Sequence, residues 1–320
     1  MTSTFAQEAI RQFAPWSHSK LELAEKCPKA FHKRHILRTK RVEGTEARVG
    51  TASHAYMENR LGGADKADAG TKALEAVKGL TTTEIETLNE RNEQSERYVA
   101  RIAAYRANRP LVHEGHEVDL AIRIDGSMCG YEDADAFLRG SVDHLMEEQG
   151  KKAVVVDHKT GKEKPIEQYR PQLDSYKVLT IQNRLHLNVI QAGVHHVQSG
   201  SIVWQRSVPR KQVQLVLLPW LLRRVQTIAG GLEGFVAKTS TLCAWCDYHT
   251  SCEEGLALFS LEKAAEMRAK AAARRLPKQP RIKKDGTPYA TRAKNIDAVR
   301  PEELESASSL YDDVDNEIIL

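Results

Sequence analysis

The chain has 320 residues, of which 41% are hydrophobic and 28% charged, with a net charge of +4 and a mean hydropathy of -0.49. At about 150 residues per domain it has room for one large domain or two ordinary ones, and its composition excludes disordered, collagenous and membrane proteins. The longest apolar run, residues 215–222, is too short to cross a bilayer, and residues 1–11 lack a secretory pattern. We therefore expect a cytoplasmic protein.

The first third of the chain is predicted to be helical. Residues 5–40 are mostly helical by pattern, with Ser17 or Ser19 as an N-cap within that stretch. A short helix is predicted over 50–61 and a longer, strongly charged one over 83–108.

Alternating apolar residues then predict a sheet. The expected strands cover residues 116–124, 128–131, 137–147, 153–157, 188–197 and 201–208. The continuous run Val154–Val156 is typical of a central strand that is covered on both faces. Helices are predicted over 165–185 and 213–232. The fold class is therefore α/β, a mixed central sheet flanked by helices, with a helical N-terminal region.

A change of composition divides the chain into a main domain, residues 1–255, and a C-terminal appendage, residues 256–320, that is partly helical or disordered. Within the appendage, residues 262–294 carry eleven Lys and Arg against three acidic residues, and residues 295–320 carry eight acidic residues against one arginine. The acidic tip, residues 310–320, ends in apolar residues. It is interpreted either as a docking peptide for a protein partner or as a solubilising end.

Two aspartates and a lysine form the main candidate site. If strands 137–147 and 153–157 pair as an antiparallel hairpin, Asp143 and Asp157 approach each other on one side of the sheet. Two close carboxylates repel each other unless a cation lies between them, and oxygen ligands suit Mg2+ or Mn2+. Lys159 shares the face of Asp157 and can position a water or stabilise charge on a phosphate. The Asp-x-Lys triplet is common by chance, but here it directly follows the Val-Val-Val run.

Three further residues extend this candidate site. Gln172 and Tyr176 are four residues apart on the next helix, so they share one face. His54, on a separate helix, supplies a candidate nitrogen ligand. Each residue alone is common in ordinary proteins, and only the set in this order is specific.

The cysteines predict a second site. Cys243, Cys246 and Cys252 have the spacing C-x2-C-x5-C, and Cys27 stands near the N-terminus. This pattern suggests a metal or cluster site rather than disulfides, and the spacing alone fits zinc and an iron–sulfur cluster equally well. Cys129 is interpreted as a small buried hydrophobic residue.

These motifs together resemble the RecB-like exonucleases of the PD-(D/E)XK nuclease superfamily, in the branch with an iron–sulfur cluster. This branch is similar to the CRISPR-associated exonucleases and AddB-type nuclease domains. The matching motifs are Ser19-x-Leu21 with Cys27-Pro28 and Phe31, Gly50-x3-His54, Gly140-x2-Asp143, Asp157-x-Lys159, Gln172-x3-Tyr176 and the cysteine triplet. The resemblance runs from Ser17 to about Glu254.

The resemblance implies specific roles. His54, Asp143, Asp157 and the carbonyl of His158 would bind a divalent metal ion. Lys159 would act in catalysis, and Gln172 and Tyr176 would support the site or hold DNA. A [4Fe-4S] cluster would be held by Cys27, Cys243, Cys246 and Cys252, mainly as a structural staple.

The expected function is a Mg2+- or Mn2+-dependent deoxyribonuclease in DNA recombination, repair or processing. An exonuclease that prefers ends or single-stranded DNA is favoured, because no motif for reading a duplex groove is present. A basic cluster, Arg34, Arg38, Lys40 and Arg41, is a candidate phosphate contact or an ordinary solvated helix face. The alternatives are a non-catalytic DNA-binding subunit of a recombination complex and a zinc-stabilised interaction protein without a DNA role.

Overall fold

The computed structural model describes residues 4–40 and 44–273. The chain divides into two compact units, residues 1–265 and 266–320. In the second unit the described residues are the end of helix α11 (Leu261–Ala273), where Lys270 and Glu266 form an ion pair. Within the described ranges, no helix has both the length and the apolar character that a membrane crossing requires.

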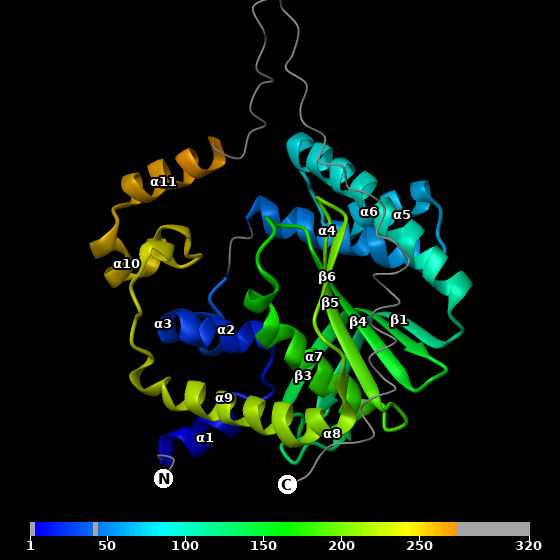
Figure 1. Cartoon of the computed structure of the whole chain (residues 1–320). Helices are drawn as coiled ribbons and strands as arrows, with labels where there is room; N and C mark the ends of the chain where they lie inside the picture. Colours follow the sequence, from blue (N-terminus) through cyan, green and yellow to red (C-terminus); the bar gives the residue numbers. More distant parts are fainter. Residues whose placement is uncertain (1–3, 41–43, 274–320) are drawn as a thin grey trace, which may run out of the picture. The chain divides into compact units, whose positions relative to one another are not determined.

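The first unit is built on a seven-stranded mixed sheet with the strand order β2-β1-β3-β4-β5-β6, in which β7 also pairs with β5 (Figure 1). The strands are β1 (Leu111–Ile122), β2 (Met128–Cys129), β3 (Leu138–Glu148), β4 (Lys152–Lys159), β5 (Val189–His196), β6 (Ser201–Trp204) and β7 (Val208–Pro209). Strands β4 and β5 are parallel, and the other pairs are antiparallel. A parallel pair needs a long crossover connection, which here contains helix α7.

Helices precede the sheet and cover it. The N-terminal ones are α1 (Thr4–Gln12), α2 (His18–Lys26), α3 (Pro28–Phe31), α4 (Thr45–Leu61), α5 (Lys66–Ala76) and α6 (Thr82–Asn108). The later ones are α7 (Arg170–Asn183), α8 (Arg210–Gln212), α9 (Leu218–Gly230) and α10 (Glu253–Leu258). Two π-helical turns, His32–Ile36 and Val213–Leu217, follow α3 and α8.

Side chains on β4 show how the two faces of the sheet are covered. Val155 belongs to the large core that includes residues of α7 and α9, whereas Val154 and Val156 pack with Tyr98 and Ile102 of α6. Successive side chains of a strand point to opposite faces, so the continuous valine run serves two apolar layers at once.

The structure confirms the predicted α/β architecture, the helical N-terminal region and the hairpin between β3 and β4. Ser17 is the N-cap of α2, where its hydroxyl accepts a hydrogen bond from the amide of Lys20. Strands β5 and β6 form a further hairpin at Ser199-Gly200, where Gly200 has the positive φ that such a turn requires. The domain boundary near residue 255 stays a prediction.

Some elements differ from the prediction. Helix α5 was not predicted, because only the small side chains of Ala69 and Ala73 are buried along it and the apolar pattern is weak. The strand predicted over 201–208 is broken into β6 and β7. Cys129 was predicted to be buried and is only half-buried, because β2 is a two-residue strand at the edge of the sheet.

Candidate active site

The hairpin of β3 and β4 brings Asp143 and Asp157 together. The two strands are antiparallel with His144 opposite Val156, and continuing this register by one residue places Asp143 opposite Asp157. The amide of His158 donates a hydrogen bond of 2.6 Å to Oδ2 of Asp143. Burial, followed by the charges of Asp157 and Glu117, raises the pKa of Asp143 to about 7 against the opposing effect of His54. A second positive charge near these carboxylates is therefore favourable.

His54 of α4 supplies a nitrogen beside these carboxylates. Its Nε2 lies 3.1 Å from the carbonyl oxygen of His158, and its Nδ1 lies 3.4 Å from Oε1 of Glu117 and 3.7 Å from Oδ2 of Asp143. Burial alone would lower the pKa of His54, but Asp143 and Glu117 raise it to about 9. The protonated ring donates to the carbonyl and compensates the carboxylates. A divalent ion can replace that proton.

Lys159 of β4 and Gln172 of α7 contact the carboxylate of Asp157, and Tyr176 of α7 contacts Gln172. Lys159 Nζ lies 2.7 Å from Oδ2 of Asp157, and the side-chain amide of Gln172 donates to Oδ1 at 2.8 Å. The same amide nitrogen is 3.0 Å from the hydroxyl of Tyr176, one helical turn further along. Burial would lower the pKa of Lys159, but Asp157 raises it, so the ammonium group stays charged. One oxygen of Asp157 thus accepts a hydrogen bond from Gln172, and the other forms an ion pair with Lys159.

All the residues predicted for this site line one cavity of about 630 Å³. They are His54, Asp143, Asp157, His158, Lys159, Gln172 and Tyr176. The structure therefore brings the predicted residues together, while their individual roles stay predictions. The ring of His158 is buried, with its Nδ1 3.1 Å from Nδ1 of His195 and its face against Tyr98. Its carbonyl, by contrast, contacts His54.

Glu117 was missed by the sequence prediction. It lies on β1 and forms, with His54 and Asp143, a group whose ligand atoms are all within 4.8 Å of one another. Its backbone has φ of 48°, in the left-handed region that is unfavourable for residues other than glycine, Asn or Asp. Such strain is concentrated at functional sites. No motif marks this position, because its proximity to Asp143 depends on the pairing of β1 with β3.

The four cysteines predicted as ligands line a second cavity of about 310 Å³. Cys27 joins α2 to α3, whereas Cys243, Cys246 and Cys252 lie on short turns before α10. Burial raises the pKa of the Cys246 thiol, and the neighbouring Cys27 and Cys252 raise it further. All four are free thiols. Among the described residues, 4–40 and 44–273, no three of these sulfurs all lie within 4.8 Å of one another. The structure thus places the four predicted ligands around one cavity, but their sulfurs do not form a compact set.

Direct contacts link the N-terminal helices to the cysteine turns. Lys29 of α3 forms an ion pair of 2.6 Å with Glu254, which is 225 residues away in the chain. Lys33 donates a hydrogen bond of 2.9 Å to the carbonyl of Ser251. These contacts hold Cys27 next to the cysteine triplet without a bound group.

Two surface predictions have different outcomes. Arg34, Arg38 and Lys40 are exposed, as expected for either a phosphate contact or a solvated face, and Arg41 lies outside the described residues. The acidic tip, residues 310–320, and most of the basic segment before it also lie outside them.

Comparison with known proteins identifies a family. The model of the PD-(D/E)XK nuclease superfamily matches residues 15–253. Among solved structures, the chain is similar to that of a "Putative exonuclease" from Eubacterium rectale, with a TM-score of 0.45 and 15% identity over 80% of this chain and 96% of the other. It is also similar to SSO0001, with a TM-score of 0.30 and 13% identity over 73% and 96% of the two chains. No curated protein matches.

Proposed function

Because the chain belongs to the PD-(D/E)XK nuclease superfamily, we propose that it is a metal-dependent deoxyribonuclease. The observation that carries this proposal is the convergence of Asp143, Asp157, His54 and Lys159 on one cavity. Two carboxylates, an imidazole and a cationic side chain are the groups that phosphodiester hydrolysis with a divalent ion requires. Membership of the superfamily implies a nucleic acid substrate.

The donor set fits a divalent ion. Asp143 and Asp157 offer carboxylate oxygens, His54 a nitrogen and His158 a backbone carbonyl, which is the oxygen-rich set that Mg2+ and Mn2+ prefer. The raised pKa of Asp143 supports this fit, because crowded buried carboxylates gain most from an added cation. When bound, the ion would activate a water and neutralise charge on the phosphate. Glu117 adds a further negative charge beside this set.

The protein side chains have separable tasks in this proposal. Lys159, held at 2.7 Å from Asp157, places a permanent positive charge where the phosphate would acquire negative charge. Gln172 orients Asp157, and Tyr176 in turn contacts Gln172. Because that orientation comes from α7, the carboxylate does not have to reorganise when substrate arrives.

We infer that the substrate is DNA with free ends or single-stranded regions and that the mode is exonucleolytic. The support is the lack of a groove-reading motif in the sequence and the exposed Arg34, Arg38 and Lys40, which can contact phosphates without base specificity. Phosphate contacts of this kind make binding sensitive to salt rather than to sequence.

The test is a cleavage assay on end-labelled single- and double-stranded DNA, with Mg2+ and with Mn2+. Asp157→Ala should abolish cleavage, and Lys159→Ala should lower the rate on the order of a hundredfold or more, as for loss of other positioned charge-stabilising groups. Lys151→Ala, at an exposed position in the turn between β3 and β4, is the control and should cleave like the parent. EDTA should stop the reaction.

Two outcomes of this assay would contradict different parts of the proposal. If folded protein cleaves no DNA with either ion, the nuclease proposal fails and a non-catalytic DNA-binding role takes its place. If covalently closed circular single-stranded DNA, tested beside the end-labelled substrates, is cleaved as fast as linear DNA, the exonuclease part alone fails.

We propose further that Cys27, Cys243, Cys246 and Cys252 hold a [4Fe-4S] cluster with a structural role. In support, the four thiols line one cavity, and among the described residues no three of their sulfurs all lie within 4.8 Å of one another. Thiolate ligands of a cluster bind different iron atoms and lie farther apart than ligands of one ion. Bound there, the cluster would join α3 to the turns before α10.

Metal analysis tests the cluster. Protein purified without oxygen should be brown and contain iron and sulfide, and Cys243→Ala should lose both together with stability, because cluster binding is coupled to folding. Cys129→Ala, which changes the half-buried cysteine outside the cavity, is the control and should retain the iron. Stoichiometric zinc without iron in the parent would contradict the assignment.

A further inference from the structure

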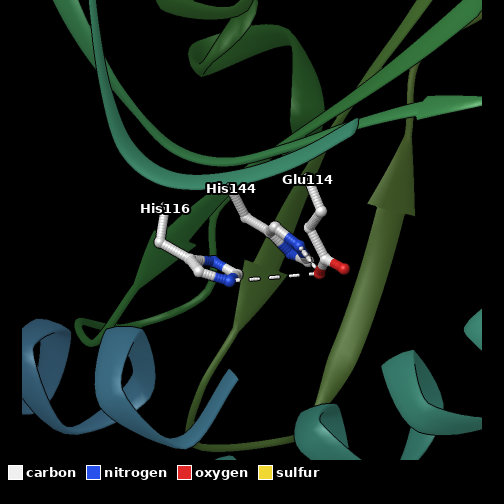
Figure 2. A group of neighbouring side chains, drawn as sticks. All are labelled: Glu114, His116 and His144. Carbon is white, nitrogen blue, oxygen red and sulfur yellow. Dashed lines mark hydrogen bonds and ion pairs between the residues drawn. The ribbon is translucent and has the colours of Figure 1, made fainter. Parts of the chain in front are cut away.

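A second group of ligand-type side chains lies on β1 and β3 (Figure 2). Glu114 and His116 are two residues apart on β1, and His116 is directly opposite His144 of β3. Asp143 and His144 are consecutive in a strand, so their side chains point to opposite faces of the sheet. The group therefore lies behind the candidate active site, on the side of α6.

The three side chains converge on a small volume. Nε2 of His144 is 2.7 Å from Oε1 of Glu114, and Nε2 of His116 is 4.0 Å from the same oxygen. One ligand atom from each residue lies within 4.8 Å of both others. A tetrahedral ion with bonds of about 2.05 Å needs ligand atoms about 3.4 Å apart, and the observed separations bracket that value.

The surroundings of the two imidazoles favour metal binding. The hydroxyl of Tyr98 is 2.7 Å from Nδ1 of His144, so it can accept a hydrogen bond from Nδ1–H and favour the tautomer whose Nε2 is unprotonated and able to bind an ion. Nδ1 of His116 is buried and has no hydrogen-bond partner in the described part of the chain. His144 is fully buried, whereas the side chains of Glu114 and His116 are 18% and 14% exposed, which leaves a route for an ion.

We propose that Glu114, His116 and His144 form a second divalent cation site of the zinc class. Two imidazoles with one carboxylate suit Zn2+ and related transition metals rather than Mg2+. Arg106 strengthens this preference, because its Nε and Nη2 donate to the two oxygens of Glu114 at 2.8 and 2.6 Å and cancel its charge. A hard ion that relies on carboxylate charge gains little there, whereas an ion that binds imidazole nitrogen is retained.

The contacts of Arg106 also allow Glu114 to bind an ion. Its Nη2 donates to the carbonyl of Leu61 at 2.7 Å as well as to Glu114. If the ion takes one lone pair of Oε1 of Glu114, that oxygen can still accept from Nη2, and Arg106 keeps the Leu61 carbonyl and the second carboxylate oxygen. The bound ion would fasten β1 to β3 one residue away from Asp143.

The test is equilibrium dialysis of the full-length protein against buffered Zn2+, followed by mass-spectrometric counting of bound zinc. His116→Gln and His144→Gln should each bind one zinc fewer than the parent. His113→Gln is the matched control, because this exposed histidine lies on the same strand outside the group, and it should bind as much as the parent. The cysteine and active-site ligands are common to all these proteins, so the difference isolates the proposed site.

Two further variants make the test decisive. Tyr98→Phe should weaken binding at this site about 10- to 100-fold, the usual effect of removing the group that orients a ligating histidine. Asp157→Asn should leave this zinc in place, so failure of the nuclease proposal would not be confused with failure of this one. If His144→Gln does not fold, the half-buried His116→Gln carries the comparison. Equal zinc in the parent and in folded His116→Gln would overturn the proposal.

Discussion

We predict that the carboxyl group of Asp143 destabilises the fold as long as no divalent ion is bound. Its side chain is 9% exposed, and burial together with Asp157 and Glu117 raises its pKa from 3.8 to about 7. At pH 8 the group is ionised in both the folded and the unfolded chain. With a pKa of 3.8 in the unfolded chain and about 7 in the folded one, the ionised group lowers the free energy of unfolding by up to ~4 kcal/mol, at about 1.36 kcal/mol per pH unit.

Asp143→Asn should therefore stabilise the metal-free protein at pH 8. The amide keeps the size of the side chain and an oxygen for the His158 amide, but it removes the charge. The pKa of about 7 already includes the favourable charge of His54, which opposes the effect of burial. We expect an increase of about 1 to 4 kcal/mol in the free energy of unfolding, as an order of magnitude.

The pH dependence of the free energy of unfolding gives the sign of this effect independently. The folded pKa of Asp143 is above the unfolded value, so the folded chain binds more protons between about pH 4 and 7. The stability that this group contributes is present below pH 4 and is lost as the pH rises to 7. The benefit of Asp143→Asn should be absent near pH 4, grow across that window and stay constant above it.

Urea unfolding followed by circular dichroism, in EDTA at several pH values, measures this benefit. Asp119→Asn, at an exposed position of β1, is the control and should change little. Adding Mn2+ should reverse the order, because the parent binds the ion and the variant loses a ligand. A metal-free variant that is less stable than the parent at pH 8, or equally stabilised at pH 4, would refute the reasoning.

Two other substitutions probe the site and the sheet. Glu117→Gln removes a charge beside His54 and Asp143, so the Mn2+ concentration for half-maximal cleavage should rise; an unchanged metal titration would contradict a role for Glu117. Gly193→Ala should lower the free energy of unfolding by about 1 to 3 kcal/mol, because the new methyl would lie 2.4 Å from the ring of Trp204. Gly161→Ala, where nothing lies within 4 Å, is the control in thermal unfolding, and equal melting temperatures for the two variants would refute the packing argument.

The strongest predictions from the sequence rest on elements whose pattern directly encodes their packing. The valine run of β4 and the short turn after β3 specify a hairpin, and the hairpin alone sets Asp143 opposite Asp157. Gln172 and Tyr176 could be placed on one face because helical spacing is fixed. In each case the distance between the residues follows from local geometry.

The parts that were missed depend on long-range pairing. Glu117 reaches His54 only because β1 pairs with β3 and because its own backbone takes a left-handed conformation. Helix α5 buries two alanines, so its sequence carries little periodic signal. The cysteines could be grouped by spacing, but their separation depends on the packing of α3 against the turns before α10.

The alternation of side chains along β3 and β4 separates two kinds of chemistry that are adjacent in the sequence. Asp157 and Lys159 point to the face of α7, where Gln172 orients the carboxylate. His158, between them, gives its carbonyl to His54 but places its ring against Tyr98 on the opposite face. An Asp-x-Lys motif thus needs a middle residue that can be buried on the other side. A charged residue in place of His158 would disturb the geometry of this motif even with Asp157 and Lys159 unchanged, because its burial against Tyr98 would be unfavourable.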